Sequence, residues 1–359
     1  MTNAHPRILL MAGGTGGHVY PGLAVARELQ ARGCAVAWLG TATGLEARLV
    51  PDANIELHCI AVRGLRGNGV LGWLRAPFAV SAAVVDAMRV LKNWRPDAVL
   101  GFGGFVAGPG GVAAWLLRKP LLIHEQNARP GLTNRLLARI SSRVLQAFPN
   151  TFSTRAAAHQ CGNPVRAEIA RVPTYEAPTG AAPVRILVLG GSQGAAFLNT
   201  TLPQALARVN SEIDLDVRHQ CGAAHANTTA TSYGEASADV SIETYIGDMA
   251  SAYEWAHLVI ARAGAMTVTE LAAAGRPSVL VPFPHAVDDH QTHNALYLVN
   301  KGAARCYQQR ALDAQTLSEA LLELLRMPQQ LGCMAVAARS AHIPDADRYV
   351  ADQCYEVAQ

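Results

Sequence analysis

The stretch AGGTGGHVYPGLAVARELQARG, Ala12 to Gly33, decides the fold because it places a glycine-rich turn between an apolar run, ILLM, and a helix-like segment. A second apolar run, AVAWLG, follows directly. A strand, a glycine-rich turn, a helix and another strand in this order are typical of a parallel sheet with crossover helices. The stretch therefore predicts a Rossmann-like α/β domain at the start of the chain.

The turn GGTGGH fits neither of two familiar phosphate-binding motifs. The Walker pattern needs a Lys after its glycines, and no Lys follows here. The dinucleotide pattern Gly-x-Gly-x-x-Gly has its first glycines at Gly14 and Gly16, but Val19 stands in place of the third. Glycines before a helix still let backbone N–H groups approach an anion, so we expect an anion site of another kind.

His18 lies where the first helix is expected to begin. One interpretation is a local hydrogen bond, and the other is a general base next to a phosphate-containing substrate. Histidine suits the second role because its ordinary pKa, about 6.5, lies near the working pH.

The opening pattern recurs halfway along the chain. RILLMAGGTGG from Arg7 is echoed by RILVLGGSQG from Arg185, and strand-like and helix-like segments alternate after both. The stretch VPTYEAPTGAAP at 172–183 has three prolines and no long apolar run, as in a surface linker. We therefore predict two similar α/β halves, with ligands at the carboxyl ends of their strands.

The composition narrows the class of protein. Half of the 359 residues are hydrophobic and the net charge is only +3, so a large core is expected and a nucleic-acid partner is not. The seven cysteines form no Cys-x-x-Cys pair, which favours reduced thiols in the cytosol. The uncharged run at 99–117 is long enough to span a membrane, but its six glycines and one proline favour a strand, a glycine loop and a helix.

The second glycine-rich turn, GGSQG at 190–194, supports two interpretations. In a phosphate turn, Ser192 would donate its hydroxyl to a diphosphate. In the nucleophile elbow of an α/β-hydrolase, Ser192 would attack an acyl group with Asp248, Asp288 and His290 as possible partners. The chain has no HGGG-type oxyanion segment, which favours the phosphate turn.

The segment from Tyr245 to Asn294 is the richest in polar side chains at expected strand ends. LVIAR and PSVLVPF are predicted strands, and a helix is expected after each. Thr267 and Glu270 have the spacing of a capping box, so Glu270 either caps a helix or accepts hydrogen bonds from two ribose hydroxyls. The polar residues that these two strand ends would present are Thr267, Glu270, Asp288, His290, Gln291 and Asn294.

Taken together, these segments resemble the MurG family of bacterial glycosyltransferases. The matching segments span nearly the whole chain: GGTGGHVYPGLAVA, GLRGNG, GFGGFVAGPGG, HEQNARPGLTNRLLA, GNPVR, GGSQGA, ARAGAMTVTELAAAGRP, PFPHAVDDHQTHNA and IPDA. The resemblance implies the GT-B fold, in which two Rossmann-like domains face each other across a cleft. It implies an N-terminal acceptor and membrane-docking domain at 1–164, completed by a C-terminal helix at 343–359, and a UDP-N-acetylglucosamine (UDP-GlcNAc) domain at 165–342.

The resemblance also implies the activity. The family transfers N-acetylglucosamine from UDP-GlcNAc to the C4 hydroxyl of N-acetylmuramic acid in lipid I, which yields lipid II for peptidoglycan. The transfer inverts the sugar carbon and forms a β1,4 link. The implied location is the cytoplasmic face of the bacterial inner membrane, and the implied partners include other proteins of cell-wall synthesis and division.

Site residues carry over from the resemblance by their motifs. The backbone at Ile246 is expected to meet the uracil, Glu270 the ribose and Gln291 the sugar hydroxyls. Further residues implied on the donor side are Asn127, Arg166, Ser192, Asn199, Arg262, Ala265, Met266, Thr267, Val268, Thr269 and Asn294. Thr15, Gly16 and Gly17 are expected at the same cleft, against either the donor or the acceptor's pyrophosphate.

The acceptor side carries over in the same way. The acceptor-binding residues implied are Gly103, Gly104, Phe105, Gly108 and Asn134, and Phe105 stands where the family often has tyrosine. The general base is expected to be His18 or, second, Glu125. Backbone amides and helix ends would stabilise the departing UDP. The chain has no Asp-x-Asp motif, so no metal cofactor is expected.

A stretch from Leu65 to Val80 mixes apolar and basic side chains. Its members that would dock on an anionic membrane surface are Leu71, Trp73, Leu74, Arg75 and Phe78, with Arg63 and Arg66 nearby. The alternative is an ordinary helix packed on its own domain.

Two other functions stay open at this point. A UDP-GlcNAc epimerase of related fold would need neither the lipid acceptor nor the membrane patch. A hydrolase would use Ser192 as its nucleophile.

Overall fold

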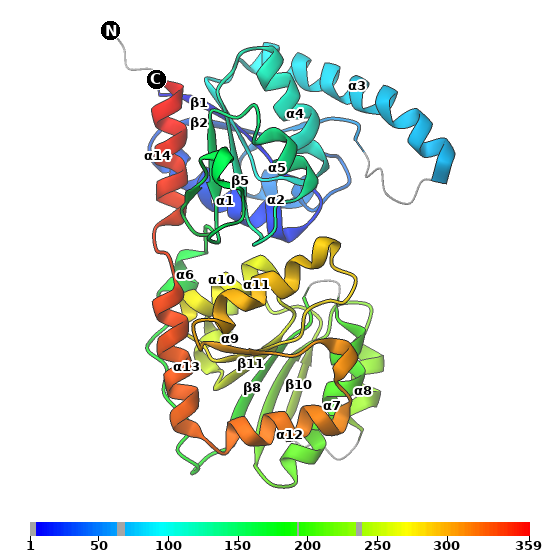
Figure 1. Ribbon diagram of the computed structural model, residues 1–359, viewed down its shortest axis with the longest axis vertical. Coiled ribbons are helices and arrows are strands. Elements are labelled where there is room, and N and C mark those ends of the chain that lie inside the picture. The colour runs from blue at the N-terminus through cyan, green and yellow to red at the C-terminus, as the bar shows by residue number, and fades with distance from the viewer. Residues whose placement is uncertain (1–4, 63–68, 192–193, 235–238) are drawn as a thin grey trace. The chain divides into compact units, whose positions relative to one another are not determined.

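A computed structural model describes residues 5–62, 69–191, 194–234 and 239–359, with the backbone alone for 69–76. The chain divides into two compact units (Figure 1): unit 1 is Met1–Val165 with Asp345–Gln359, and unit 2 is Arg166–Pro344. These bounds differ by one and two residues from the predicted domain limits at 164 and 343. The proline-rich stretch at 172–183 lies inside unit 2 and is not the division between the units.

Unit 1 contains a seven-stranded parallel sheet among its described residues, in the order β3-β2-β1-β4-β5-β6-β7. The strands are β1 Arg7–Met11, β2 Ala35–Gly40, β3 Glu56–Cys59, β4 Ala98–Gly101, β5 Leu121–Glu125, β6 Arg143–Gln146 and β7 His159–Gln160. The order reverses between β1 and β4, so a crevice is expected outside the carboxyl ends of these two strands.

Helices cover both faces of this sheet. They are α1 Gly16–Ala31, α2 Glu46–Asp52, α3 Gly69–Trp94, α4 Gly104–Leu116, α5 Leu132–Leu137 and α14 Ala346–Ala358. Successive residues of β1 enter opposite cores: Ile8 packs with one cluster and Leu9 with the other. Because both faces are buried, the apolar run of this strand is continuous and not alternating.

Unit 2 repeats this topology within the part of it that the structure describes. Its parallel sheet has the order β10-β9-β8-β11-β12-β13. The strands are β8 Val184–Leu189, β9 Leu215–Gln220, β10 Val240–Glu243, β11 Leu258–Ala261, β12 Ser278–Leu280 and β13 Ala304–Cys306. The helices are α6 Ala167–Ala170, α7 Ala196–Asn210, α8 Ala226–Tyr233, α9 Met249–Trp255, α10 Ala265–Ala274, α11 His290–Val299, α12 Ala314–Leu325 and α13 Pro328–Ala341. The prediction of two Rossmann-like halves is confirmed.

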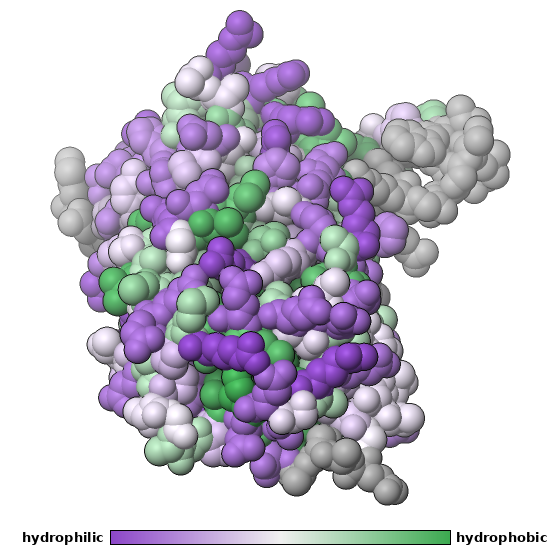
Figure 2. Space-filling view, turned by 60° about the horizontal axis from the view of Figure 1, so that its bottom comes forward, coloured by the Kyte–Doolittle hydropathy of each residue, from purple (hydrophilic) through white to green (hydrophobic). Residues whose placement is uncertain are grey.

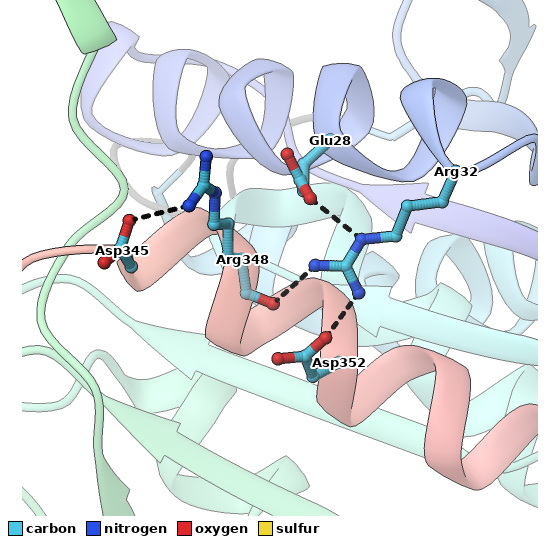
Figure 3. Close-up of polar contacts among 5 residues, drawn as sticks. All are labelled: Glu28, Arg32, Asp345, Arg348 and Asp352. Atoms are coloured by element: carbon cyan, nitrogen blue, oxygen red, sulfur yellow. Dashed lines mark hydrogen bonds and ion pairs between the residues drawn. The ribbon is translucent and has the colours of Figure 1, made fainter.

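The C-terminal helix α14 belongs to unit 1 and packs on α1. Val350 and Cys354 are fully buried in the same core as residues of α1. Figure 3 shows the polar contacts at this junction: Arg32, directly after α1, donates to Glu28 of α1 at 2.8 Å and also pairs with Asp352 of α14. Buried apolar contact therefore holds α14 to α1, and exposed ion pairs of this kind add about 1 kcal/mol or less.

The glycine loop predicted within 99–117 is wrong, although the strand and the helix predicted on either side of it are confirmed as β4 and α4. Helix α4 already begins at Gly104. A Cβ at Gly110 would lie 2.9 Å from Leu39 Cδ2, and one at Gly111 would lie 2.7 Å from Leu137 Cδ2. These glycines therefore let the helix pack closely on its neighbours, which compensates for their low helix propensity.

Exposed apolar side chains of the described residues are spread over many elements. In the view of Figure 2, hydrophobic residues form small areas separated by hydrophilic ones. Phe78 on α3 is 80% exposed and Val336 on α13 is 70% exposed. Among the described helices, none has the length and the apolar character needed to cross a bilayer.

Candidate active site

Two glycine turns meet at the switch point of unit 1. Gly13 follows β1, and Gly103 and Gly104 follow β4. The φ angles of Gly103 and Gly104 are +95° and +79°, a region that L side chains rarely adopt. A Cβ on Gly104 would lie 2.5 Å from the carbonyl oxygen of Gly13. The structure thus brings together two motifs that lie 90 residues apart, and only glycine fits at their contact.

His18 lies beside this contact, in the first turn of α1. Its Nδ1 is 3.2 Å from Thr15 Oγ1, so the local hydrogen bond expected for it is present. A Cβ on Gly103 would lie 3.3 Å from His18 Nε2 and 3.4 Å from Asn134 Nδ2. The half-exposed imidazole and the buried amide of Asn134 therefore flank the backbone of Gly103.

Glu125 ends β5 and is only 2% exposed. Its Oε1 accepts hydrogen bonds from the backbone and side-chain nitrogens of Asn127 at 3.0 and 3.1 Å. Its Oε2 accepts from Gly131 N at 3.1 Å and from Asn134 Nδ2 at 2.9 Å. Burial raises the pKa of Glu125, and these four donors oppose that effect. Each carboxylate oxygen already accepts two hydrogen bonds, so Glu125 holds the 126–134 loop in place.

Glu46 is a site residue that sequence reasoning missed. It opens α2 and is fully buried beneath the first glycine turn. Its Oε2 accepts from Gly14 N at 3.0 Å, and its Oε1 accepts from Thr41 N at 3.0 Å and Thr41 Oγ1 at 2.7 Å. An internal carboxylate thus takes the Gly14 amide that was expected to meet a ligand anion. The available signal was an acidic residue after the second strand, a common site of function in Rossmann folds.

Glu270 lies on α10 in unit 2 and has two partners. Tyr253 Oη donates to its Oε2 at 3.0 Å, and Arg166 Nη2 lies 3.4 Å from its Oε1. Burial raises the pKa of Glu270, and the charge of Arg166 opposes this. The predicted capping box is wrong because α10 begins two residues earlier than expected, at Ala265, with Gly264 as its N-cap and no side-chain cap. The sequence around Glu270 does not indicate Tyr253 as its partner, because the two residues lie 17 positions apart.

Gln291 lies in the first turn of α11, after the loop that follows β12. Its Oε1 accepts from Phe283 N at 2.9 Å. Asp288 and Asp289, just before it, have φ angles of +53° and +49°, a left-handed conformation that Asp tolerates better than most residues. Unusual backbone of this kind often marks a functional site, and here it sets the position of Gln291.

Three other predicted donor residues have partners inside unit 2. Asn199 bonds Cys221 O and His219 Nε2, each at 3.0 Å. Asn294 Nδ2 donates to Ala263 O at 3.1 Å. Arg262 donates to backbone carbonyls that follow β12, and burial lowers its pKa to about 10. These contacts position the strand ends, and binding of the donor by these side chains stays a prediction.

The remaining predicted residues are placed as follows. Ile246 is buried. Thr15 occupies the N-cap position of α1 without a side-chain cap, and Gly16 and Gly17 lie in the first turn of that helix. Phe105 is 54% exposed on α4, which also carries Gly108. Met266, Thr267, Val268 and Thr269 lie in the first two turns of α10. Ser192, Arg63 and Arg66 fall outside the described residues, as do the side chains of Leu71, Trp73, Leu74 and Arg75.

The hydrolase constellation does not form among the residues that are described. Asp248 caps α9 by accepting from Ser251, and His290 Nδ1 bonds Val287 O at 2.8 Å. Neither side chain takes part in the Asp–His pair that a catalytic triad needs. Nor do three or more His, Cys, Asp or Glu side chains gather as a metal site within the described ranges.

Two family models match the chain, the N-terminal domain of glycosyltransferase family 28 over residues 8–146 and its C-terminal domain over residues 185–349. The chain has the GT-B fold and belongs to glycosyltransferase family 28. Both switch points lie within the matched regions, and every strand except β7 lies within them or begins one residue before them.

Individual relatives narrow the assignment within glycosyltransferase family 28. The chain is 54% identical over 351 residues, 98% of each chain, to UDP-N-acetylglucosamine–N-acetylmuramyl-(pentapeptide) pyrophosphoryl-undecaprenol N-acetylglucosamine transferase of Pseudomonas putida. It is 51% identical over 355 residues to the protein of that name from Chromohalobacter salexigens, covering 98% of this chain and 96% of the other. The crystal structure of Acinetobacter baumannii MurG matches with a TM-score of 0.83 at 44% identity, over 98% of this chain and 99% of that one. The predicted membership of the MurG family is confirmed.

A more distant match bears on the epimerase alternative. The crystal structure of a UDP-N-acetylglucosamine 2-epimerase from Listeria monocytogenes has a TM-score of 0.68 at 14% identity, covering 97% of this chain and 95% of that one. At this identity the match shows a common fold only.

We expect Glu46→Gln to destabilise unit 1. The glutamine amide nitrogen would face either Gly14 N–H or the Thr41 donors, so one buried donor loses its acceptor. The loss should be about 1–3 kcal/mol of unfolding free energy, visible as a lower thermal midpoint in calorimetry. Asp52→Asn, an exposed change on the same helix, is the matched control, and equal midpoints for the two variants would contradict the assignment.

Acid should weaken unit 2 through His219, which is fully buried between Tyr233 Oη and Asn199 Oδ1. Burial lowers its pKa to about 4. The unfolded chain therefore binds the proton first as pH falls from about 6.5 to 4, and the folded state loses up to about 3 kcal/mol over that window. Thermal midpoints measured across this range should fall less steeply for His219→Gln than for the wild type. The exposed change His285→Gln should leave the slope unchanged.

Proposed function

We propose that the chain transfers N-acetylglucosamine from UDP-GlcNAc to the C4 hydroxyl of N-acetylmuramic acid in lipid I and so makes lipid II for peptidoglycan. The observation that carries this proposal is the identity of 54% over 98% of both chains with the Pseudomonas putida transferase. The two switch points, each with polar side chains at the ends of its strands, agree with such an enzyme.

His18 is the general base in this proposal. The acceptor hydroxyl attacks C1 of the donor sugar and its proton passes to the imidazole, while the bond from C1 to the phosphate oxygen breaks and UDP leaves with the electron pair. His18 is half-exposed beside Gly103, whereas all four hydrogen-bonding positions of Glu125 are occupied. Glu125 would have to give up a hydrogen bond before it could accept a proton, so we assign it the positioning of Asn134.

The donor binds unit 2 in this proposal. Helix α10 begins directly after β11, and its first-turn amides have no side-chain cap, so they suit the diphosphate. Glu270, oriented by Tyr253 and Arg166, suits the ribose hydroxyls. We propose that these amides and Ser192 stabilise the leaving UDP and that the reaction needs no metal.

We further propose that the protein acts at the cytoplasmic face of the inner membrane, on its anionic surface. This rests on Phe78, which is 80% exposed on the long helix α3, and on the basic and apolar residues that precede it in the sequence. Other proteins of cell-wall synthesis and division would meet it at the same membrane.

The experiment is a transfer assay with labelled UDP-GlcNAc and a short-chain lipid I analogue, with and without EDTA. We expect transfer that EDTA does not change. His18→Ala should lower kcat by about 10²- to 10⁴-fold with little change in the KM for UDP-GlcNAc, because a base acts mainly in the transition state. His159→Ala, an exposed change in the same unit, should leave kcat unchanged.

The variant Glu125→Gln distinguishes between His18 and Glu125 as the general base. It should lower the thermal midpoint along with kcat, because an amide nitrogen would then face donors of the loop. If it lowers kcat at an unchanged midpoint while His18→Ala stays active, Glu125 is the base. Conversion of the donor to its epimer without transfer would contradict the proposed function.

Membrane docking can be tested with vesicles of phosphatidylglycerol. Phe78→Ser should weaken co-sedimentation about tenfold or more, since burial of a Phe side chain is worth about 1.5–3 kcal/mol. Val336→Ser, at the most exposed apolar residue described on α13, is the control and should bind like the wild type. Equal binding of both variants would contradict the proposal that Phe78 docks on the membrane.

A further inference from the structure

A pocket of about 430 Å³ lies in unit 2 at the amino ends of β8, β11 and β12, whereas the site discussed above lies at the carboxyl ends of the strands. It is lined by the 173–176 segment, by Arg185 near the start of β8, by parts of 251–257 and by Arg276. We call it the Arg185 pocket. No residue assigned above to catalysis or substrate binding lines it.

Two donors face each other at this pocket. His257 Nδ1 accepts a hydrogen bond from the backbone N–H of Arg185 at 3.0 Å. A neutral imidazole that accepts at Nδ1 carries its proton on Nε2. That Nε2 lies 2.9 Å from Nη2 of Arg185, which is also only a donor. An acceptor placed between the two groups would relieve this contact.

Two further donors at the pocket have no acceptor among the described residues. Arg276 is only 2% exposed: its Nε donates to Tyr253 O at 2.6 Å and its Nη2 to Pro173 O at 3.1 Å, but its Nη1 has no partner. Nε of Arg185 is likewise buried and unpartnered. Buried polar groups are nearly always paired in native proteins, so several unpaired donors at one cavity indicate a ligand with acceptor oxygens.

The charges around the pocket also favour an anionic ligand. The rim carries Glu176 and Glu254, which are exposed and form no ion pair with either arginine. Burial raises the pKa of Asp216 on β9 and the charge of Arg185 opposes this rise, but no hydrogen bond between the two residues is present. Burial and the nearby charge of Arg339 lower the pKa of Arg276 to about 10, so the guanidinium still carries its charge near neutral pH. The floor of the pocket therefore presents cations and N–H donors, and its acids stay at the rim.

We propose that the Arg185 pocket binds a small soluble oxyanion, a phosphate or a carboxylate group, whose oxygens accept hydrogen bonds from Arg185, His257 and Arg276. The site is separate from the donor site but connected to it. Arg276 bonds the backbone of Tyr253 on α9, and the hydroxyl of the same Tyr253 orients Glu270.

The test titrates the full chain with inorganic phosphate against chloride at constant ionic strength. Saturating UDP is present, so that the proposed donor site does not contribute. We expect a saturable rise in the thermal midpoint and a calorimetric binding isotherm for the wild type, both lost in Arg185→Gln. Glu254→Gln should lower the Kd for phosphate several-fold, because it removes a carboxylate from the rim. Arg326→Gln, at an exposed arginine of unit 2, should bind like the wild type.

Three results would overturn the proposal. The first is no saturable response of the wild type, and the second is an equal response in Arg185→Gln. The third is a midpoint in chloride that is much lower for Arg185→Gln than for Arg326→Gln, since removing a donor that lacks an acceptor should not destabilise the fold. Binding to phosphatidylglycerol vesicles that depends on Arg185, without any response to free phosphate, would replace the soluble anion by a lipid headgroup.

Discussion

The close approach of backbone at the carboxyl ends of β1 and β4 is the constraint on which unit 1 depends. Neighbouring parallel strands bring their following turns together, and here Gly104 meets the carbonyl oxygen of Gly13 with no room for a side chain. The same closeness recurs where α1 crosses the sheet, because a Cβ on Gly22 would lie 2.6 Å from Trp38. The glycines that look like a ligand loop in the sequence are thus first of all a requirement of packing.

Three largely buried carboxylates differ in role, and the hydrogen bonds that each one accepts show the difference. Glu46 and Glu125 accept bonds from backbone and side-chain donors of the loops around them, so both act as internal anchors. Among the described residues Glu270 bonds Tyr253 and Arg166, which leaves its carboxylate capacity for further donors. Glu125 accepts four hydrogen bonds from described residues and the fully buried Glu46 accepts three, so these two carboxylates serve the fold, whereas Glu270 can still accept from a substrate.

The two units use one topology for different tasks. In unit 1 the helix after β1 carries His18 next to the second glycine turn. In unit 2 the start of α10, after the strand β11 that corresponds to β4, has no side-chain cap and suits an anion. The same sheet order therefore presents a proton acceptor in one unit and backbone donors in the other.

The sequence by itself determined the strands, the glycine turns, the two similar halves and the family, because continuous apolar runs and ordered motifs are local features. It wrongly predicted a glycine loop within 99–117 and a later start for α10. At both places packing against neighbours overrides the local preference of glycine and threonine. Only the tertiary structure decided which side chains meet: Glu46 with Gly14, Arg166 with Glu270, and Arg185 with His257 lie 32, 104 and 72 residues apart. Such contacts depend on strand order and register, which place distant residues together without leaving a pattern in the sequence around either one.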